Sequence, residues 1–370
     1  MPQILSTRQL NRTLLARQHL LARVEMSVPA LTEHLIGLQS QIPNPAYIGA
    51  WTRLATFERD RLTQHIEQRE IVRVAMMRST LHLVTADDHN RFRSVIQPAL
   101  EKALRSFFGK DAKRLDVDTL AEAARPFLLD EPRTTGELRD FLLTIDPDGE
   151  PNAMAYAVRT HLPLVQVPPA GTWGAGTRAS YTVADDYVTS DAQASDLETL
   201  FRRYLRAYGP ASIMDFQTWV GMTRLTKPLN AIKAQFTLYE SEKGEVLFDL
   251  PEMNIIEADT PAPVRFIPEY DNILIAHRDR TRILTDDDYS KVFLSAARVL
   301  STFLVDGVVA GTWKINRDKA DAELVISPFR ENDISSDTRD ALVAEGEALL
   351  RFVEADADDY SVRFGAEERT

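Results

Sequence analysis

Three stretches of the chain show the same succession of patterns, and this repetition constrains the fold more than any other feature. Each stretch has helical periodicity, a short helix, another helix and then alternating strand-like residues. The short helices begin in VPALTEHL, EPRTTGEL and GPASIMDF, with proline near the start and an acidic residue that we place in the first turn. Because proline-capped helices are common, a chance similarity of these starts is the alternative.

The predicted elements give each repeat a helical core followed by a hairpin. In residues 1–87 we predict helices over 6–26, 29–38, 45–54 and 58–68, and a hairpin over 70–88 with a break near 77–79. In residues 88–190 we predict helices over 88–108, 131–142 and 152–160, and a hairpin over 162–183. In residues 191–254 we predict helices over 197–207, 209–222 and 227–234, and a hairpin over 235–250 that turns at Lys243-Gly244. Three helices closed by a hairpin form a winged helix, so we predict three tandem winged-helix units.

Local signals mark two of the short helices. Thr134 followed by Glu137 fits a capping box, and Ser212 followed by Asp215 has the same spacing. After residue 255 the pattern becomes rich in strands, over 263–280, 302–315 and 322–329, with a hairpin signal at Asp306-Gly307. A helix over 337–354 and a last strand follow. The sequence therefore predicts an α+β fold in which residues 255–370 form a β-rich scaffold.

Composition excludes several classes of site. The chain has no cysteine, which rules out disulfides, a thiolate nucleophile and a cysteine-based zinc site, and which fits a reducing cytoplasm. No uninterrupted apolar run reaches the roughly 18 residues of a membrane span, and the start does not resemble a signal peptide. We therefore expect a cytoplasmic protein with no membrane partner.

The net charge of −12 is unevenly distributed. Residues 1–110 hold 15 Lys or Arg and 9 Asp or Glu, a balance of +6, so the remainder carries −18. Lysine and arginine can follow the phosphates of DNA even when the whole protein is acidic. The N-terminal part is therefore the expected DNA-binding part.

Two glutamines, Gln39 and Gln41, stand where a helical pattern ends ahead of Pro43. Pro43 disfavours helical backbone at the residue before it, so the segment is predicted to be extended. Residues at i and i+2 lie on the same side of an extended segment, so both amides can converge on one spot. The alternative is a solvated helix end capped by side-chain amides.

Four motifs in sequence, spread over nearly the whole chain, resemble one family. They are LQSQ (38–41), MMRSTLHLVTADDH (76–89), FIPEYDNILIAHRDR (266–280) and VDGVVAGTWKI (305–315). Together they resemble the bacterial winged-helix DNA glycosylases of the AlkZ/YcaQ type, in the branch with a Gln-x-Gln pair. The resemblance implies a C-shaped arrangement with a central DNA-binding cleft. It also implies excision of N-alkylated purines from double-stranded DNA, including interstrand crosslinks, with Gln39 and Gln41 as the catalytic pair.

Two amides suffice chemically when the substrate is an alkylated purine. Most glycoside hydrolysis needs two carboxyl groups, one of which protonates the leaving group. A purine alkylated at N7 or N3 is already cationic, so it departs as a neutral base and needs no general acid. The amide carbonyls then only have to orient a water and favour the developing positive charge on the sugar.

Further candidates surround these motifs. The predicted DNA contacts are Arg73, Arg78 and His82 on the first hairpin and Trp313 with Lys314 on a glycine-rich hairpin. A surface position for His82 and a β-core position for Trp313 are the alternatives. The predicted lesion pocket is Glu269, Tyr270, Asp271 and Asn272, for which the alternative is a turn capped by Asp271.

No histidine spacing or phosphate loop indicates a metal or nucleotide site. We therefore expect a monomeric, monofunctional DNA glycosylase without metal or cofactor. The competing class is a non-catalytic DNA-binding protein, such as a regulator or lesion sensor. The helices over 46–54 and 227–234, which would read bases in such a protein, are poor in Arg, Asn and Gln, which disfavours sequence readout.

Overall fold

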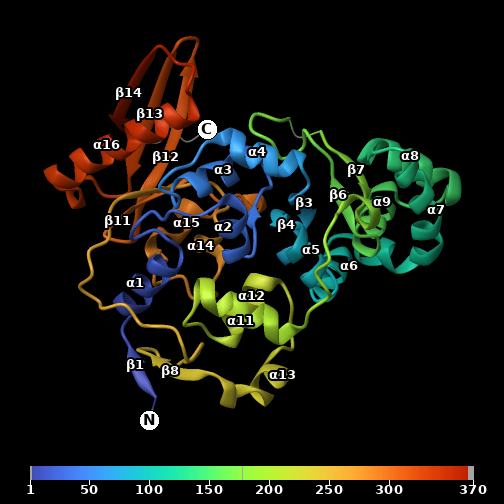
Figure 1. Ribbon diagram of the computed structural model, residues 1–370, viewed down its shortest axis with the longest axis horizontal. Helices are drawn as coiled ribbons and strands as arrows, with labels where there is room; N and C mark the ends of the chain where they lie inside the picture. The colour runs from blue at the N-terminus through green and yellow to red at the C-terminus, as the bar shows by residue number, and fades with distance from the viewer. Residues whose placement is uncertain (1, 177, 366–370) are drawn as a thin grey trace.

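The computed structural model describes residues 2–176 and 178–365, and helices and strands are mixed throughout as in an α+β fold. Residues 28–85 lie near the centre of Figure 1 and residues 97–161 form a helical group at its right. Residues 197–250 lie below, and residues 308–364 rise at the upper left. No helix among these described residues is long and apolar enough to span a bilayer.

The first repeat contains every predicted element, but its first helix is shorter than expected. The elements are β1 (Gln3–Leu5), α1 (Thr7–Arg17), α2 (Val28–His34), β2 (Leu38–Gln39), α3 (Pro43–Trp51), α4 (Arg59–Glu67), β3 (Ile71–Ala75), the 3₁₀ turn η1 (Met77–Ser79) and β4 (Leu81–Thr85). The prediction of a helix to residue 26 is wrong, because Val24 forms a bridge with Leu54 and needs extended backbone. Glu33 lies in the last turn of α2, so the prediction of an acid in its first turn is also wrong.

The described residues of the second repeat form six helices where three were predicted. Its elements are α5 (Ala86–Phe92), α6 (Gln97–Arg114), α7 (Val117–Asp130), β5 (Arg133–Thr134), α8 (Thr135–Ile145), α9 (Pro151–His161), β6 (Leu164–Gln166), β7 (Ser180–Val183) and α10 (Ala184–Tyr187). The helix predicted over 88–108 is broken into α5 and α6, and Pro98 stands in the first turn of α6. The capping box is confirmed: Glu137 N–H donates to Thr134 Oγ1 at 3.3 Å, and Thr134 N–H donates to Glu137 Oε2 at 2.8 Å.

The third repeat matches its prediction closely. Its elements are α11 (Leu197–Tyr208), α12 (Ile213–Val220), α13 (Thr226–Ala231), the 3₁₀ turn η2 (Lys233–Gln235), β8 (Thr237–Ser241) and β9 (Val246–Asp249). Ser212 and Asp215 form the expected capping box at the start of α12. Gly244 has φ +78° in the predicted hairpin turn. The N-terminal β1 adds to this hairpin in parallel with β8.

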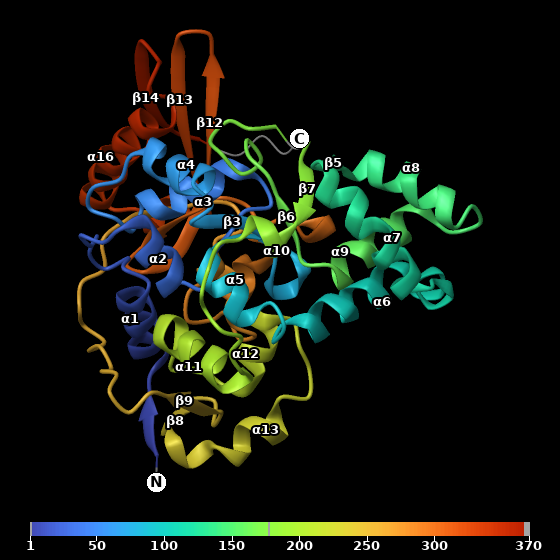
Figure 2. The ribbon, with the colours of Figure 1, turned by 45° about the vertical axis from the view of Figure 1, so that its right-hand side comes forward.

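The C-terminal part forms a five-stranded sheet in the order β10-β11-β12-β13-β14, seen projecting from the molecule in Figure 2. Its elements are β10 (Arg265–Ile267), α14 (Asn272–Ile275), η3 (Asp286–Asp288), α15 (Tyr289–Val292), η4 (Ser295–Ala297), β11 (Thr302–Val305), β12 (Val308–Asp318), β13 (Asp321–Pro328), η5 (Glu331–Asp333), α16 (Ser336–Val353) and β14 (Asp359–Phe364). The predicted hairpin turn is confirmed, since Asp306 and Gly307 both have positive φ. Residues 272–275, expected in a strand-rich stretch, instead form α14, capped by Asp271.

The hairpins of the first two repeats join into one six-stranded sheet, in the order β2-β4-β3-β6-β7-β5. The contact between the repeats is the antiparallel pairing of β3 with β6. This sheet places β2 at an edge, next to the interior strand β4.

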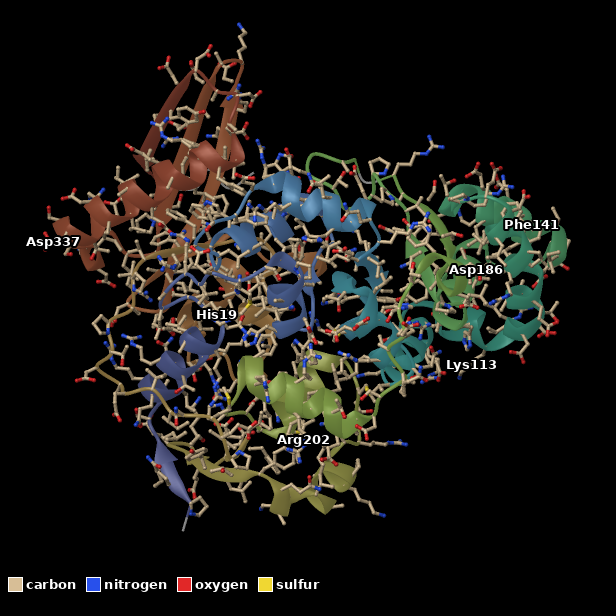
Figure 3. All side chains as sticks on the ribbon, in the orientation of Figure 1. His19, Lys113, Phe141, Asp186, Arg202 and Asp337 are labelled. Carbon is tan, nitrogen blue, oxygen red and sulfur yellow. The ribbon has the colours of Figure 1, made fainter. Side chains whose placement is uncertain are left out.

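The largest hydrophobic core connects the first and third repeats with the start of the scaffold. It includes Leu14, Val74, Tyr204 and Leu304. Helices α7–α9 have a core of their own, and Phe141 on α8 lies at the far side of Figure 3 from Asp337 on α16, with His19 between them. Two cores hold the segments that build the site below: the largest one includes Ile36, Met77 and Ile273, and a second one includes Leu38, Ala50 and Leu54.

Candidate active site

A sharp turn between α2 and β2 places Gln39 in extended backbone. Gly37 has φ +101°, and a Cβ on it would lie 2.7 Å from Val84 Cγ1 and 2.9 Å from the carbonyl oxygen of Leu83. Because glycine alone tolerates this conformation and this approach, β2 can pair closely with β4. Gln39 then stands opposite His82. The prediction that Gln39 lies in an extended segment is confirmed.

We expect Gly37→Ala to lower the free energy of unfolding by about 1–3 kcal/mol, because it adds backbone strain and a steric contact with β4. Urea denaturation followed by circular dichroism measures the change. Gly176→Ala is the control, since nothing lies within 4 Å of a Cβ at that position. Equal stability of the two variants would contradict this account of the turn.

Arg78 holds the side-chain amide of Gln39. Its Nη2 donates to Gln39 Oε1 at 2.7 Å and to Asn272 Oδ1 at 3.1 Å, and its Nη1 donates to the carbonyl oxygen of Trp219. A guanidinium has no acceptor, so the carbonyl oxygen of Gln39 must be the atom that faces it. Burial lowers the pKa of Arg78 to about 10, so the guanidinium stays charged at neutral pH. Arg78 thereby connects the first hairpin with the predicted lesion pocket, and its guanidinium serves these internal contacts instead of the DNA contact we predicted.

Gln41 has different partners from Gln39. Its side chain is exposed, and its Oε1 accepts a hydrogen bond from Leu81 N–H at 3.3 Å. Arg73 donates to the carbonyl oxygen of Ser40 at 2.9 and 2.7 Å and to that of Gln41 at 3.1 Å. It also donates to Gln166. Arg73 therefore fixes the backbone between the two glutamines, and its buried guanidinium serves these contacts instead of the phosphate contact we predicted.

Gln39 lies at a small hollow that opens to solvent. The wall of this hollow includes Gln39, Arg53, Tyr208, Glu269, Asp271 and Asn272. Three of the four residues predicted for a lesion pocket thus surround the same space as Gln39. The fourth, Tyr270, and the second glutamine, Gln41, are not in its lining.

A buried ion pair supports this wall. Arg53 Nη1 and Nη2 donate to Asp271 Oδ2 and Oδ1, both at 2.8 Å, and both side chains are almost fully buried. Asp271 Oδ1 also accepts from Ile273 N–H at 3.0 Å, so the expected capping role of Asp271 is confirmed. Arg53 Nη2 reaches Gln18 Oε1 at 3.2 Å. Sequence reasoning missed Arg53, because its partner lies 218 positions away and no local pattern connects them.

Glu269 and Tyr270 are both partly exposed. Burial raises the pKa of the Glu269 carboxyl, and the exposed Arg298 opposes that shift. Among the described residues the Glu269 carboxylate has no hydrogen-bond or ion-pair partner. Tyr270 has φ +61°, which turns the chain between Glu269 and the buried Asp271.

His82 is fully buried, which argues against the predicted DNA contact. It lies on β4, an interior strand with both faces covered. Its Nδ1 lies 3.0 Å from the carbonyl oxygen of Thr80. Burial, aided by the neighbouring Arg78, lowers its pKa to about 3, so the ring is neutral at physiological pH.

Trp313 belongs to the core of the scaffold. Its Nε1 donates to the carbonyl oxygens of Ile267 and Thr302 at 3.1 and 2.9 Å, and its ring meets the edge of Phe266. The β-core alternative therefore describes Trp313, and its indole offers no free N–H to DNA. Lys314, the next residue on β12, is partly exposed and stays a predicted DNA contact. Within residues 2–176 and 178–365, no three His, Asp or Glu side chains are grouped to hold a metal ion.

Comparison with known proteins identifies the class to which this chain belongs. A family model described as "DNA glycosylase AlkZ-like" matches residues 32–352, a range that contains Gln39, Arg78 and the segment 268–272. The match places the chain among the DNA glycosylases, enzymes that cut the bond between base and sugar. Within that class, the chain belongs to the AlkZ-like family, as its four motifs indicated.

Two relatives span almost the full chain. The interstrand DNA cross-link repair glycosylase of Streptomyces sahachiroi is 24% identical over 353 residues, which cover 89% of this chain and 92% of that protein. The solved structure of Streptomyces sahachiroi DNA glycosylase AlkZ matches with a TM-score of 0.82 at 20% identity, covering 98% of this chain and 100% of that one. This likeness supports the α+β fold described above.

Proposed function

We propose that the protein hydrolyses the N-glycosidic bond of purines alkylated at N7 or N3 in double-stranded DNA, including bulky adducts and interstrand crosslinks. The observation that carries this proposal is the amide of Gln39, held by a charged arginine at the edge of a hollow. Membership of a DNA glycosylase family and a relative named for cross-link repair support the same substrate class.

Gln39 supplies orientation and a dipole instead of a proton. Its Oε1 accepts one hydrogen bond from Arg78 and keeps a second lone pair. That lone pair orients the attacking water and favours positive charge on the sugar as the neutral base departs. Gln41 joins the reaction by exchanging its bond with Leu81 N–H for one with the same water or with DNA.

The lining of the hollow favours simple hydrolysis. It contains no lysine, so no side-chain amine stands ready to form a Schiff base with the sugar. The product is then an intact strand with an abasic site, as expected of a monofunctional glycosylase that works without a cofactor.

The three repeats, 1–87, 88–190 and 191–254, act as winged-helix units arranged as a C around the duplex on the scaffold 255–370. Their order of helices and hairpins, and the similarity to the solved glycosylase structure, support this arrangement. Lys314 holds a phosphate, and cationic side chains of the N-terminal part, where Lys and Arg outnumber Asp and Glu, hold others. The protein works as a monomer on DNA in the cytoplasm.

The test is base release from a duplex that carries one N7-methylguanine, with a second duplex crosslinked through guanine N7. Chromatography identifies the freed base, and heating in alkali converts the abasic site into a strand break. We expect both signals with protein and neither in the buffer blank. Tight binding to these duplexes with no more breakage than the blank would instead favour the non-catalytic DNA binder.

We expect Arg78→Lys to slow base release by about 10- to 100-fold, because the shorter ammonium cannot hold Gln39, Asn272 and the backbone at once. Single-turnover kinetics on the N7-methylguanine duplex measure the effect, and the affinity for undamaged DNA should change little. Arg105→Lys is a matched control on an exposed ion pair of α6. If Arg78→Lys released base at the wild-type rate, Arg78 would have no role in positioning Gln39.

A further inference from the structure

We propose that Glu269 determines specificity for positively charged lesions, because its carboxylate supplies the negative charge that a cationic purine or sugar meets in the hollow. This inference deepens the proposed function and rests on it. It assigns Glu269 an electrostatic role, distinct from the water-orienting role of Gln39.

Among the charged residues around the hollow, one carboxylate remains to supply negative charge to a cationic ligand. Arg53 and Asp271 neutralise each other through two hydrogen bonds of 2.8 Å. Arg78, which bonds the wall residues Gln39 and Asn272, has only neutral oxygens as partners and adds a positive charge. Without a further anion, the hollow would repel the cation that the reaction requires.

Glu269 is the remaining carboxylate of the wall. It is partly buried and has no ion-pair partner within the described residues, so its charge is available to a ligand. The opposite charge that acts on it, Arg298, is exposed to solvent, which screens the attraction. Tyr270 is the other titratable neighbour: burial raises its pKa, and the Glu269 carboxylate raises it further.

The same geometry predicts a dependence on pH. Burial raises the pKa of Glu269 above its usual value, so the carboxylate becomes neutral at a higher pH than an exposed glutamate would. The preference for cations is then present above this raised pKa and is lost as the pH falls through it. Titration of His82 does not produce the same pH dependence, because its pKa of about 3 keeps the ring neutral in the pH range where Glu269 titrates.

Two abasic-site analogues separate charge from shape. One duplex carries a pyrrolidine, which is cationic, and the other carries a tetrahydrofuran, which is neutral. We expect the wild-type protein to bind the pyrrolidine duplex more tightly and Glu269→Gln to lose roughly tenfold of that preference. Glu269→Asp, which retains the charge, should keep part of it. Glu257→Gln, an exposed residue, is the control for net charge.

The outcomes distinguish this inference from the function on which it rests. Fluorescence anisotropy titrations between pH 5 and 8 measure the preference for the pyrrolidine duplex. In the wild-type protein this preference should fall toward low pH, and in Glu269→Gln it should not. The inference is overturned if Glu269→Gln keeps the wild-type preference and pH profile while base release proceeds normally. Failure of the wild-type protein to release any alkylated base would instead overturn the proposed function.

Discussion

Replacement of Gln39 by alanine should slow release of N7-methylguanine by about 10²- to 10³-fold, the range found when one positioned polar group is removed from a catalytic site. The variant loses the carbonyl that orients water, and it leaves Arg78 without one of its three acceptors. Gln39 lies on β2, an edge strand that pairs with β4 through backbone hydrogen bonds. Removal of its side chain should therefore leave the fold intact. Single-turnover kinetics with excess protein isolate the chemical step from DNA binding.

The matched control is Gln193→Ala, which removes an exposed glutamine from the segment ahead of α11. It should retain the wild-type rate, and both variants should bind the methylated duplex with wild-type affinity. A Gln39→Ala protein that binds normally and still releases base at the wild-type rate would remove Gln39 from the mechanism. Loss of DNA binding together with activity would point to a positioning role for the segment instead.

Replacement of Arg53 by methionine should lower the free energy of unfolding by about 3–5 kcal/mol, the cost of leaving one member of a buried ion pair unpaired. The Asp271 carboxylate would remain buried at the start of α14 with only Ile273 N–H as a partner. Because Asp271 and Asn272 line the hollow, base release should fall as well. Urea denaturation gives the stability, and its midpoint should move with little change in slope.

A surface ion pair provides the comparison. Arg206 lies 3.3 Å from Glu252, and both side chains are more than half exposed, so Arg206→Met should cost at most about 1 kcal/mol. The double variant Arg53→Met, Asp271→Asn should be less destabilised than the sum of its two single variants, because neither charge is then left alone. If Arg53→Met and Arg206→Met lowered the free energy of unfolding equally, the buried Arg53–Asp271 pair would not have the stabilising role described here.

Features that depend on neighbouring residues could be predicted. The capping boxes at Thr134 and Ser212 and the hairpin turn at Asp306-Gly307 are all present, because each involves residues within a few positions of one another. The helix predicted to residue 26 failed for the opposite reason: Val24 pairs with Leu54, and that contact overrides local helical propensity. Trp313 likewise occupies a core that assembles from strands distant in the sequence.

The sequence by itself determined the family, the α+β class and the extended backbone at Gln39, since motif order, periodicity and the constraint of Pro43 are properties of the chain. Only the tertiary structure decided which polar groups meet. Arg78 reaches Asn272 across 194 positions, and Arg53 reaches Asp271 across 218. Such contacts arise when whole units pack on a shared core, and their free energy depends on burial and partners that no local pattern specifies. For the same reason, only the packed structure shows that Glu269, beside Gln39, has no hydrogen-bond or ion-pair partner among the described residues.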